Sequence, residues 1–170
     1  MRAGQREFGE IVRRHQAMVF SIAHHMLRDA TAAEDVAQDV FLQLHQHLAA
    51  IESEPHMISW LRRVACQRSI DQCRKRKLRT HPGLEHLPEP AAPRDGRDPM
   101  LAALLEKLVG SLPPRARAVV VLRYQEDLDP SEIAAMLEVP VATVKSQLHR
   151  SLTILRARLE RKTVCKGAPR

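Results

Sequence analysis

Aromatic residues are scarce in this chain: they make up 3% of its 170 residues, with a single tryptophan and a single tyrosine. Sheet-rich sandwiches depend on aromatic and β-branched side chains, whereas hydrophobic residues of all kinds still reach 44% here. The composition therefore favours aliphatic packing between helices, and we expect an all-α protein. The length permits one ordinary domain or two small ones, so the pattern along the chain has to decide between them.

Long apolar runs are also missing. No stretch approaches the ~20 consecutive apolar residues of a membrane span. The first ten residues include Arg2, Arg6, Glu7 and Glu10, and they lack the apolar core of a secretion signal. We therefore expect the protein to stay in the cytoplasm.

Cysteine is limited to Cys66, Cys73 and Cys165, an odd number without the spacing of a disulfide framework. Cys66 and Cys73 lie two turns apart on an expected helix, so about 10 Å separates them along its axis. That separation is too long for a disulfide and two thiols are too few for a zinc site. Buried or half-buried thiols are the favoured interpretation, and a redox-sensing role stays open.

Recognisable catalytic and metal-binding patterns are absent as well. The pairs His24-His25 and His45-Gln46-His47 lack the i, i+4 spacing that places two imidazoles on one helix face. There is no glycine-rich phosphate loop, no nucleophile elbow and no cluster of metal ligands. The sequence therefore predicts solvated histidines, no metal, no cofactor and no enzyme.

Positive charge is what the chain has in excess. The formal net charge is +7, so the surface attracts polyanions at neutral pH. Nucleic acid is the leading candidate partner, and a merely soluble basic protein is the alternative that charge alone leaves open.

Three helices are expected in the N-terminal half. Apolar residues at helical spacing begin at Phe8 and define a first helix that ends near Arg28-Asp29. Thr31 and Glu34 have the spacing of a capping box, which predicts that a second helix starts at about Ala32. After a segment closed by Pro55, a third helix is expected from about Met57, with an apolar first half and a strongly basic second half.

Prolines then interrupt the helical pattern between Thr80 and Asp98, which indicates a linker. We predict one helical domain over residues 1–80, a flexible linker over 81–97, a second helical domain over 98–165 and a tail over 166–170. The linker composition also predicts that the chain binds DNA weakly on its own, because the two domains are then mutually occluded or misplaced.

Four helices are expected in the second domain. Asp98-Pro99 suits a helix start and Gly110 a helix stop. A further helix runs from Pro114 to about Tyr124, in spite of the β-branched run Val119–Val121. Asp129-Pro130-Ser131-Glu132 caps a short helix that ends at Leu137. A tight turn and a longer helix from about Ala142 follow.

Short helix, tight turn and longer polar helix form the layout of a helix-turn-helix, in which the second helix enters the major groove. Val144, Leu148 and Leu152 are expected to pack against Ile133, Ala134 and Leu137. An ordinary helical hairpin is the alternative. The side chains expected to face DNA are Thr143, Lys145, Ser146, Gln147, His149 and Arg150.

Four blocks in order carry a resemblance to a known family: residues 33–44 (AEDVAQDVFLQL), 60–77 (WLRRVACQRSIDQCRKRK), 112–124 (LPPRARAVVVLRY) and 132–151 (EIAAMLEVPVATVKSQLHRS). With these blocks the chain resembles the extracytoplasmic-function group of bacterial sigma-70 factors, from about Phe8 to Leu159. The resemblance implies region 2 of that family in the first domain and region 4, with its helix-turn-helix, in the second.

The resemblance implies core RNA polymerase as a partner, through the clamp coiled coil of the largest subunit and the flap, and it implies an anti-sigma factor as an inhibitor. The helix over residues 33–44 would dock on the coiled coil, which fits an acidic and amide face that complements a basic partner. A merely solvated face is the alternative for each residue. That face consists of Asp35, Gln38, Asp39 and Gln43.

The resemblance also implies that residues 51–56 and the third helix open the minus-ten element of promoter DNA and hold an unstacked base. Trp60 is favoured as a core residue over a stacking platform. Gln67 stands where the family often has asparagine, and Gln147 where it often has arginine, so base preference is left open. The expected minus-ten residues are Arg62, Arg63, Gln67, Arg68, Asp71, Arg74, Arg76 and Lys77.

Two other classes of protein remain as rivals. A conventional regulator would bind an operator as a dimer through the same helix-turn-helix, and a thiol or metal sensor would use the three cysteines and nine histidines.

Overall fold

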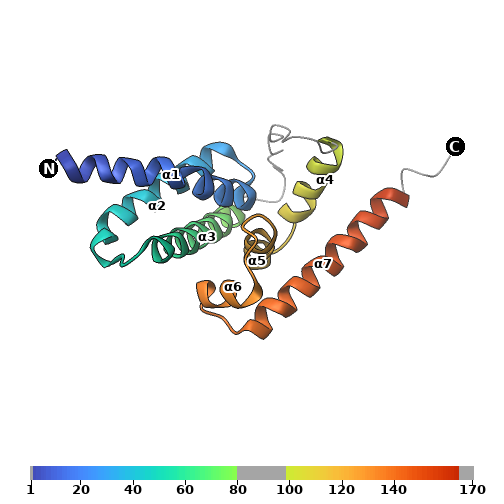
Figure 1. Cartoon of the computed structure of the whole chain (residues 1–170). Helices are drawn as coiled ribbons and strands as arrows, with labels where there is room; N and C mark the ends of the chain where they lie inside the picture. The colour runs from blue at the N-terminus through green and yellow to red at the C-terminus, as the bar shows by residue number, and fades with distance from the viewer. Residues whose placement is uncertain (1, 80–98, 165–170) are drawn as a thin grey trace. The chain divides into compact units, whose positions relative to one another are not determined.

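A computed structural model of the chain describes residues 2–79 and 99–164 (Figure 1). All regular secondary structure in these two ranges is helical. Contacts between residues divide the chain into two compact units: unit 1 is Met1–Pro88 and unit 2 is Glu89–Arg170. The expected all-α fold with two helical domains is confirmed. The predicted linker 81–97 and tail 166–170, as well as the helix-start residue Asp98, lie outside the described residues.

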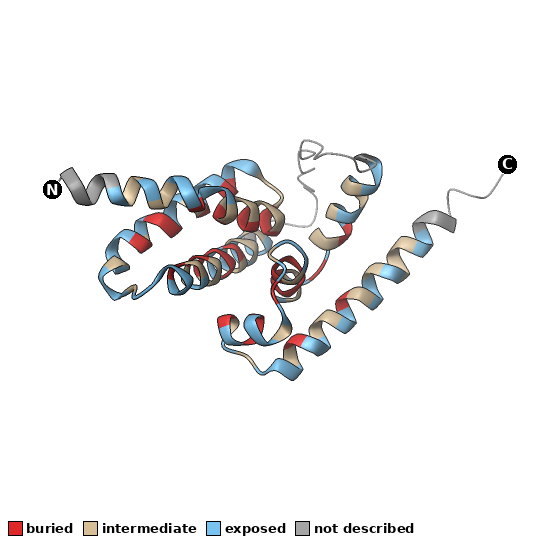
Figure 2. Ribbon diagram, viewed as in Figure 1, coloured by how far each residue is buried: buried red, intermediate tan, exposed pale blue. Residues whose placement is uncertain are grey.

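Unit 1 contains α1 (Arg2–Leu27), α2 (Ala30–His47), a 3-10 turn η1 (Leu48–Ala50) and α3 (Glu54–Arg79). Each of the three α-helices packs against the other two. The faces that meet are buried, as Figure 2 shows, and their fully buried side chains include the aliphatic Ile22, Leu44 and Leu61. The aliphatic core expected from the scarcity of aromatic residues is therefore the core that forms.

All three helix starts in unit 1 differ from expectation, and α1 begins at Arg2, before the apolar pattern that starts at Phe8. The predicted capping box at Thr31 and Glu34 is wrong: Asp29 is the N-cap of α2, and its carboxylate accepts a hydrogen bond from the Ala32 N–H at 2.9 Å. The predicted start of α3 at Met57 is also late, because the helix begins at Glu54. Pro55 opens this helix rather than closing the segment before it, since the first turn needs no intrahelical donor from that position.

Unit 2 contains α4 (Pro99–Gly110), α5 (Pro114–Tyr124), α6 (Pro130–Leu137) and α7 (Val141–Val164). In this unit α7 packs against α4, α5 and α6. The Val119–Val121 run is helical, as predicted. All three valines are buried in unit 2, and this burial accounts for the strand-like run of apolar residues. Val144 is fully buried, whereas Leu148 and Leu152 are only half-buried.

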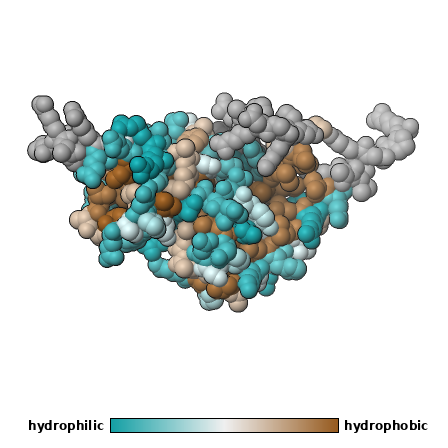
Figure 3. All heavy atoms as spheres, in the orientation of Figure 1, coloured by the Kyte–Doolittle hydropathy of each residue, from teal (hydrophilic) through white to brown (hydrophobic). Residues whose placement is uncertain are grey.

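Several large apolar side chains of unit 2 are exposed, and three of them lie on α4. Met100, Leu101 and Leu105 on α4 are exposed, and Figure 3 shows hydrophobic surface where α4 and α7 lie. Exposed apolar patches of this kind mark contact surfaces on many proteins. Within the described residues, no helix is both long enough and apolar enough to span a membrane.

A histidine without any distinctive sequence pattern lies in the core of unit 1. His15 on α1 is buried, and its Nε2 atom has no hydrogen-bond partner. Burial lowers the pKa of His15; the Glu54 carboxylate opposes this effect and the Arg14 guanidinium adds to it. Arg14 and Glu54 are themselves paired, with 3.0 Å between Nη1 and Oε1, and they join α1 to the first turn of α3.

This histidine makes the stability of unit 1 depend on pH. Because its pKa is lowered on folding, the unfolded chain binds a proton more readily, and unit 1 is expected to lose stability as the pH falls below 6.5 toward the folded-state value. Urea unfolding at pH 7.5 and pH 5.5 measures the effect. His15→Leu removes the titrating group, so its stability should change less between the two pH values; an equal change in both proteins would contradict the assignment.

Candidate functional site

The helix-turn-helix is built from α6, α7 and the turn between them. Asp129 caps α6 by accepting from the N–H groups of Ser131 at 2.6 Å and Glu132 at 2.9 Å, and the Glu132 carboxylate accepts from the Asp129 N–H at 2.7 Å. The two backbone hydrogen bonds hold the pKa of Asp129 below its usual value. This reciprocal capping box confirms the predicted start of the short helix.

A left-handed residue ends α6 and sets the direction of the turn. Glu138 has φ 56° and ψ 46°, and the Val139 N–H donates to the Ala134 carbonyl at 3.0 Å. The Thr143 N–H then donates to the Pro140 carbonyl at 2.9 Å in the first turn of α7. The buried Val144 packs into unit 2 and fixes which face of α7 points outward.

The outward face of α7 carries the side chains predicted to meet the major groove. Lys145, Ser146, His149 and Arg150 are exposed, while Thr143 and Gln147 are half-buried. These six residues occupy the first turns of α7, and none of them is part of the core. The face offers hydrogen-bond donors, hydrogen-bond acceptors and positive charge. It lies at the N-terminal end of α7, which is the end that contacts base edges in a DNA-bound helix-turn-helix.

The predicted minus-ten residues follow the length of α3. Arg62, Arg63 and Arg76 are half-buried, and the exposed members are Gln67, Arg68, Asp71, Arg74 and Lys77. Arg74 and Arg76 both form ion pairs within unit 1. Arg74 lies 3.6 Å from Asp71 one turn earlier on α3, and Arg76 lies 2.6 Å from Asp29 at the start of α2.

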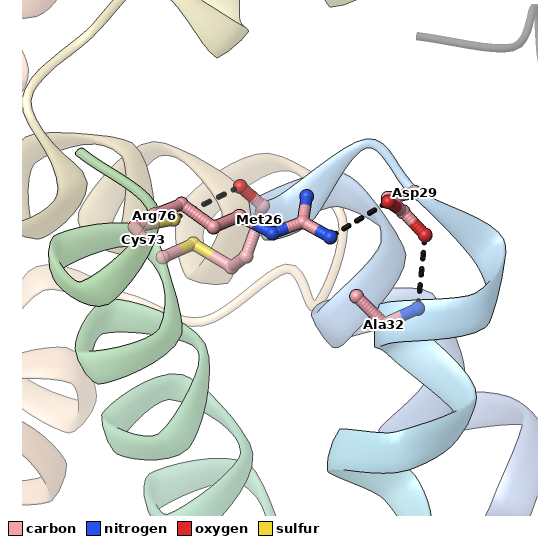
Figure 4. Close-up of polar contacts among 5 residues, drawn as sticks. All are labelled: Met26, Asp29, Ala32, Cys73 and Arg76. Atoms are coloured by element: carbon pink, nitrogen blue, oxygen red, sulfur yellow. Dashed lines mark hydrogen bonds and ion pairs between the residues drawn. The ribbon is translucent and has the colours of Figure 1, made fainter. Parts of the chain in front are cut away.

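Figure 4 shows that Asp29 holds two groups at once. One carboxylate oxygen accepts from the Ala32 N–H and caps α2, and the other accepts from Arg76 of α3. Nearby, the Cys73 thiol lies 3.6 Å from the Met26 carbonyl. The positive charge of Arg76 is therefore offset inside the unit, and this arginine ties the turn between α1 and α2 to the basic end of α3.

Two substitutions of Asp29 separate its two contacts. Asp29→Asn keeps a good capping side chain and loses the ion pair, which is partly exposed, so we expect a loss of up to about 1 kcal/mol in the free energy of unfolding. Asp29→Ala loses the cap as well and should cost about 1 kcal/mol more. Urea unfolding of both variants measures the difference, and equal losses would show that the cap contributes nothing.

The predicted polymerase-docking residues lie on α2. Asp35, Gln38 and Asp39 are exposed, whereas Gln43 is half-buried. The side-chain amide of Gln43 lies against Arg68 of α3; with its oxygen turned toward the guanidinium it accepts from Nε at 2.6 Å and from Nη2. Gln43 therefore differs from the other three, because its polar group meets another helix of the same unit.

The segment before α3 is ordered by local contacts. The Ser53 hydroxyl accepts from the His56 N–H at 3.3 Å, and the Glu52 N–H donates to His56 Nδ1 at 3.4 Å. Trp60 is half-buried, with its ring centroid 5.9 Å from that of His47. Trp60 is thus neither a fully buried core residue nor a fully exposed platform.

The thiols fit the simpler interpretation, and the histidines fit it only in part. Cys66 is buried and Cys73 is half-buried, and neither forms a disulfide, while Cys165 lies outside the described residues. His45 and His47 are exposed, but His24 and His25 are half-buried, so the prediction of solvated histidines holds for one pair only. In the part of the chain that the structure describes, no three His, Cys, Asp or Glu side chains are grouped to hold a metal ion.

Sequence reasoning missed the roles of Asp29, Gln43 and His15. An aspartate three residues before Ala32 was a visible capping signal for Asp29, in competition with the one at Thr31. For Gln43 and His15 no local signal exists, because their surroundings come from helices distant in sequence.

Comparison with known proteins gives consistent matches over both units. The family model described as Sigma-70 region 2 matches residues 11–79, and the one described as Sigma-70, region 4 matches residues 102–155. The RNA polymerase sigma-E factor of Streptomyces coelicolor is 36% identical over 155 residues, covering 90% of this chain and 86% of that protein. The ECF RNA polymerase sigma factor SigW of Bacillus subtilis is 29% identical over 168 residues, covering 91% and 90%.

The fold has a counterpart among solved structures. The sigma factor RpoE from Bartonella quintana, in its co-crystal structure with the anti-sigma factor NepR, matches with a TM-score of 0.69 at 17% identity. The match covers 91% of this chain and 97% of that one.

Proposed function

The chain belongs to the extracytoplasmic-function group of the sigma-70 family, and from this premise we propose that it binds core RNA polymerase and directs promoter-specific initiation of transcription. The observation that carries the proposal is the order of the two units: a region 2 unit with a basic helix precedes a region 4 unit with a helix-turn-helix. The chain would act as a non-catalytic subunit, and the polymerase would make the RNA bonds. Because polymerase and chromosome share the cytoplasm, the protein would work there.

Docking on the polymerase is assigned to both units. On α2, the exposed acidic and amide side chains Asp35, Gln38 and Asp39 offer charge complementarity to a basic clamp coiled coil. On α4, exposed Met100 and Leu105 support an apolar contact of unit 2, for which the polymerase flap is the proposed partner.

Promoter recognition is divided between α3 and α7. The cations of α3 contact phosphates of the minus-ten element, which offsets part of the cost of unstacking a base. The first turns of α7 read the minus-thirty-five element in the major groove; Gln147 and Arg150 suit base edges and Lys145 suits phosphate. The positions of these elements on the polymerase surface fix the spacing between them.

RpoE from Bartonella quintana binds an anti-sigma factor, and we propose that this chain binds a partner of the same class. Such an inhibitor would cover polymerase-facing surfaces, so it should compete with core polymerase for the chain. Competition between a candidate anti-sigma protein and core polymerase in a fluorescence assay tests this part of the proposal, and simultaneous binding of both would oppose it.

Footprinting of the reconstituted holoenzyme on a promoter that it transcribes tests the assignment of the two elements. Lys145→Ala with Arg150→Ala should remove protection of the upstream element first. Arg68→Ala with Arg74→Ala should instead reduce permanganate reactivity of the melted minus-ten region. If both double variants weaken the same element, the division of labour between α3 and α7 is wrong.

A further inference from the structure

The contact between Gln43 and Arg68 joins the helix proposed to dock on polymerase to the helix proposed to grip DNA. Gln43 is half-buried on α2 and Arg68 is exposed on α3. With the Gln43 amide turned so that its oxygen faces the guanidinium, that oxygen accepts from the Nε and Nη2 groups along one edge. A guanidinium has five N–H donors, so the outer edge, which includes Nη1, keeps donors for another partner.

The chemistry of this contact differs from that of the ion pairs formed by Arg76 and Arg74 on α3. Arg76 is paired with the Asp29 carboxylate and Arg74 with Asp71, and in both cases a negative charge offsets the cation. Gln43 is neutral, so it orients the Arg68 guanidinium without offsetting its positive charge. An oriented and uncompensated guanidinium is well suited to bidentate binding of a phosphate.

We propose that Gln43 is a positioning residue for Arg68, holding the guanidinium so that its outer edge meets a phosphate of the melted promoter strand. This inference rests on the proposed function, because it requires α3 to contact DNA. It assigns Gln43 to DNA binding through Arg68 and not to direct contact with the polymerase. The benefit comes from ordering a long side chain before binding, which removes part of the entropic cost of association.

The test uses the full-length chain and a fluorescein-labelled single strand of mixed sequence, with binding followed by anisotropy over a series of low salt concentrations. Gln43→Met keeps the size and helix propensity of the side chain and removes its acceptor. Gln46→Met, at an exposed glutamine on the same helix, is the matched control. Circular dichroism checks that each variant is folded.

The expected pattern separates positioning from a general effect. Arg68→Ala should weaken binding and lower the salt slope by about 0.7, the value for one lost phosphate contact on a single strand. Gln43→Met should weaken binding by roughly two- to tenfold with the slope nearly unchanged, because the contact still forms. In the Arg68→Ala background, Gln43→Met should not weaken DNA binding any further. The Gln46→Met variant should bind DNA like the unmodified protein.

Each other outcome has a definite meaning. If Arg68→Ala changes neither the affinity nor the salt slope, α3 does not contact DNA at this position. The proposed role of α3 in DNA binding is then wrong at Arg68, and so is the inference about Gln43. If Arg68→Ala weakens binding but Gln43→Met does not, or if Gln43→Met acts equally in the Arg68→Ala background, only the positioning role is overturned. It is also overturned if Gln43→Met reduces affinity for core polymerase and leaves DNA binding unchanged.

Discussion

Replacing Asp35 and Asp39 together with lysine is expected to weaken binding to core RNA polymerase by about a hundredfold or more. Both carboxylates are exposed on α2 and lie one turn apart, so the proposed basic partner surface meets them together. Reversal replaces attraction by like-charge repulsion, which costs several kcal/mol across an interface. Titration of labelled protein with core polymerase measures the affinity directly.

The matched control reverses two other exposed acids of unit 1. Glu7 and Glu10 lie on α1, and replacing both with lysine changes the net charge by the same amount. This control should bind polymerase within a few fold of the unmodified protein. If the two double variants bind equally weakly, net charge rather than the α2 face controls docking.

Truncation of core leucine or isoleucine should have the largest effect on stability, and each truncation should affect one unit. Leu61 in unit 1 and Ile133 in unit 2 are both fully buried. Replacement by alanine is expected to cost about 2–5 kcal/mol in the free energy of unfolding, because the cavity is only partly refilled. The free energy of unfolding of a small helical domain is only a few kcal/mol, so the affected unit should be largely unfolded at modest temperature.

Hydrogen exchange followed by mass spectrometry assigns the loss to a unit. Leu61→Ala should accelerate exchange in α1, α2 and α3 and leave α5, α6 and α7 protected, and Ile133→Ala should give the reverse pattern. Equal acceleration throughout the chain in both variants would mean that the two units unfold as one.

The helices themselves were predictable because their signal is local and periodic. Apolar spacing identified α1, and the Asp129 to Glu132 pattern identified the start of α6. Even the Val119–Val121 run was assigned correctly, because Pro114 and the flanking arginines outweighed β propensity. Local rules failed where two signals competed: Thr31 and Asp29 both resemble N-caps, and Pro55 resembles a stop as well as a start.

Partners across the fold were not predictable from local patterns. The type of side chain identified Arg68 and Arg76 as cations on a basic helix, but their partners Gln43 and Asp29 are distant in sequence. Packing of α2 against α3 brings them together. The same applies to His15, whose burial depends on the whole three-helix core. Residue type thus predicts the kind of partner, and tertiary packing decides which residues are already engaged.

Transcription from a randomised promoter library by core polymerase, with and without this chain, tests the central claim most directly. With the chain present, the start sites should share two sequence elements at one fixed spacing, and Asp35→Lys with Asp39→Lys should abolish that enrichment. Transcription that starts at the same sites without the chain, or enriched templates that share a single symmetric element, would contradict the assignment of a two-unit sigma factor.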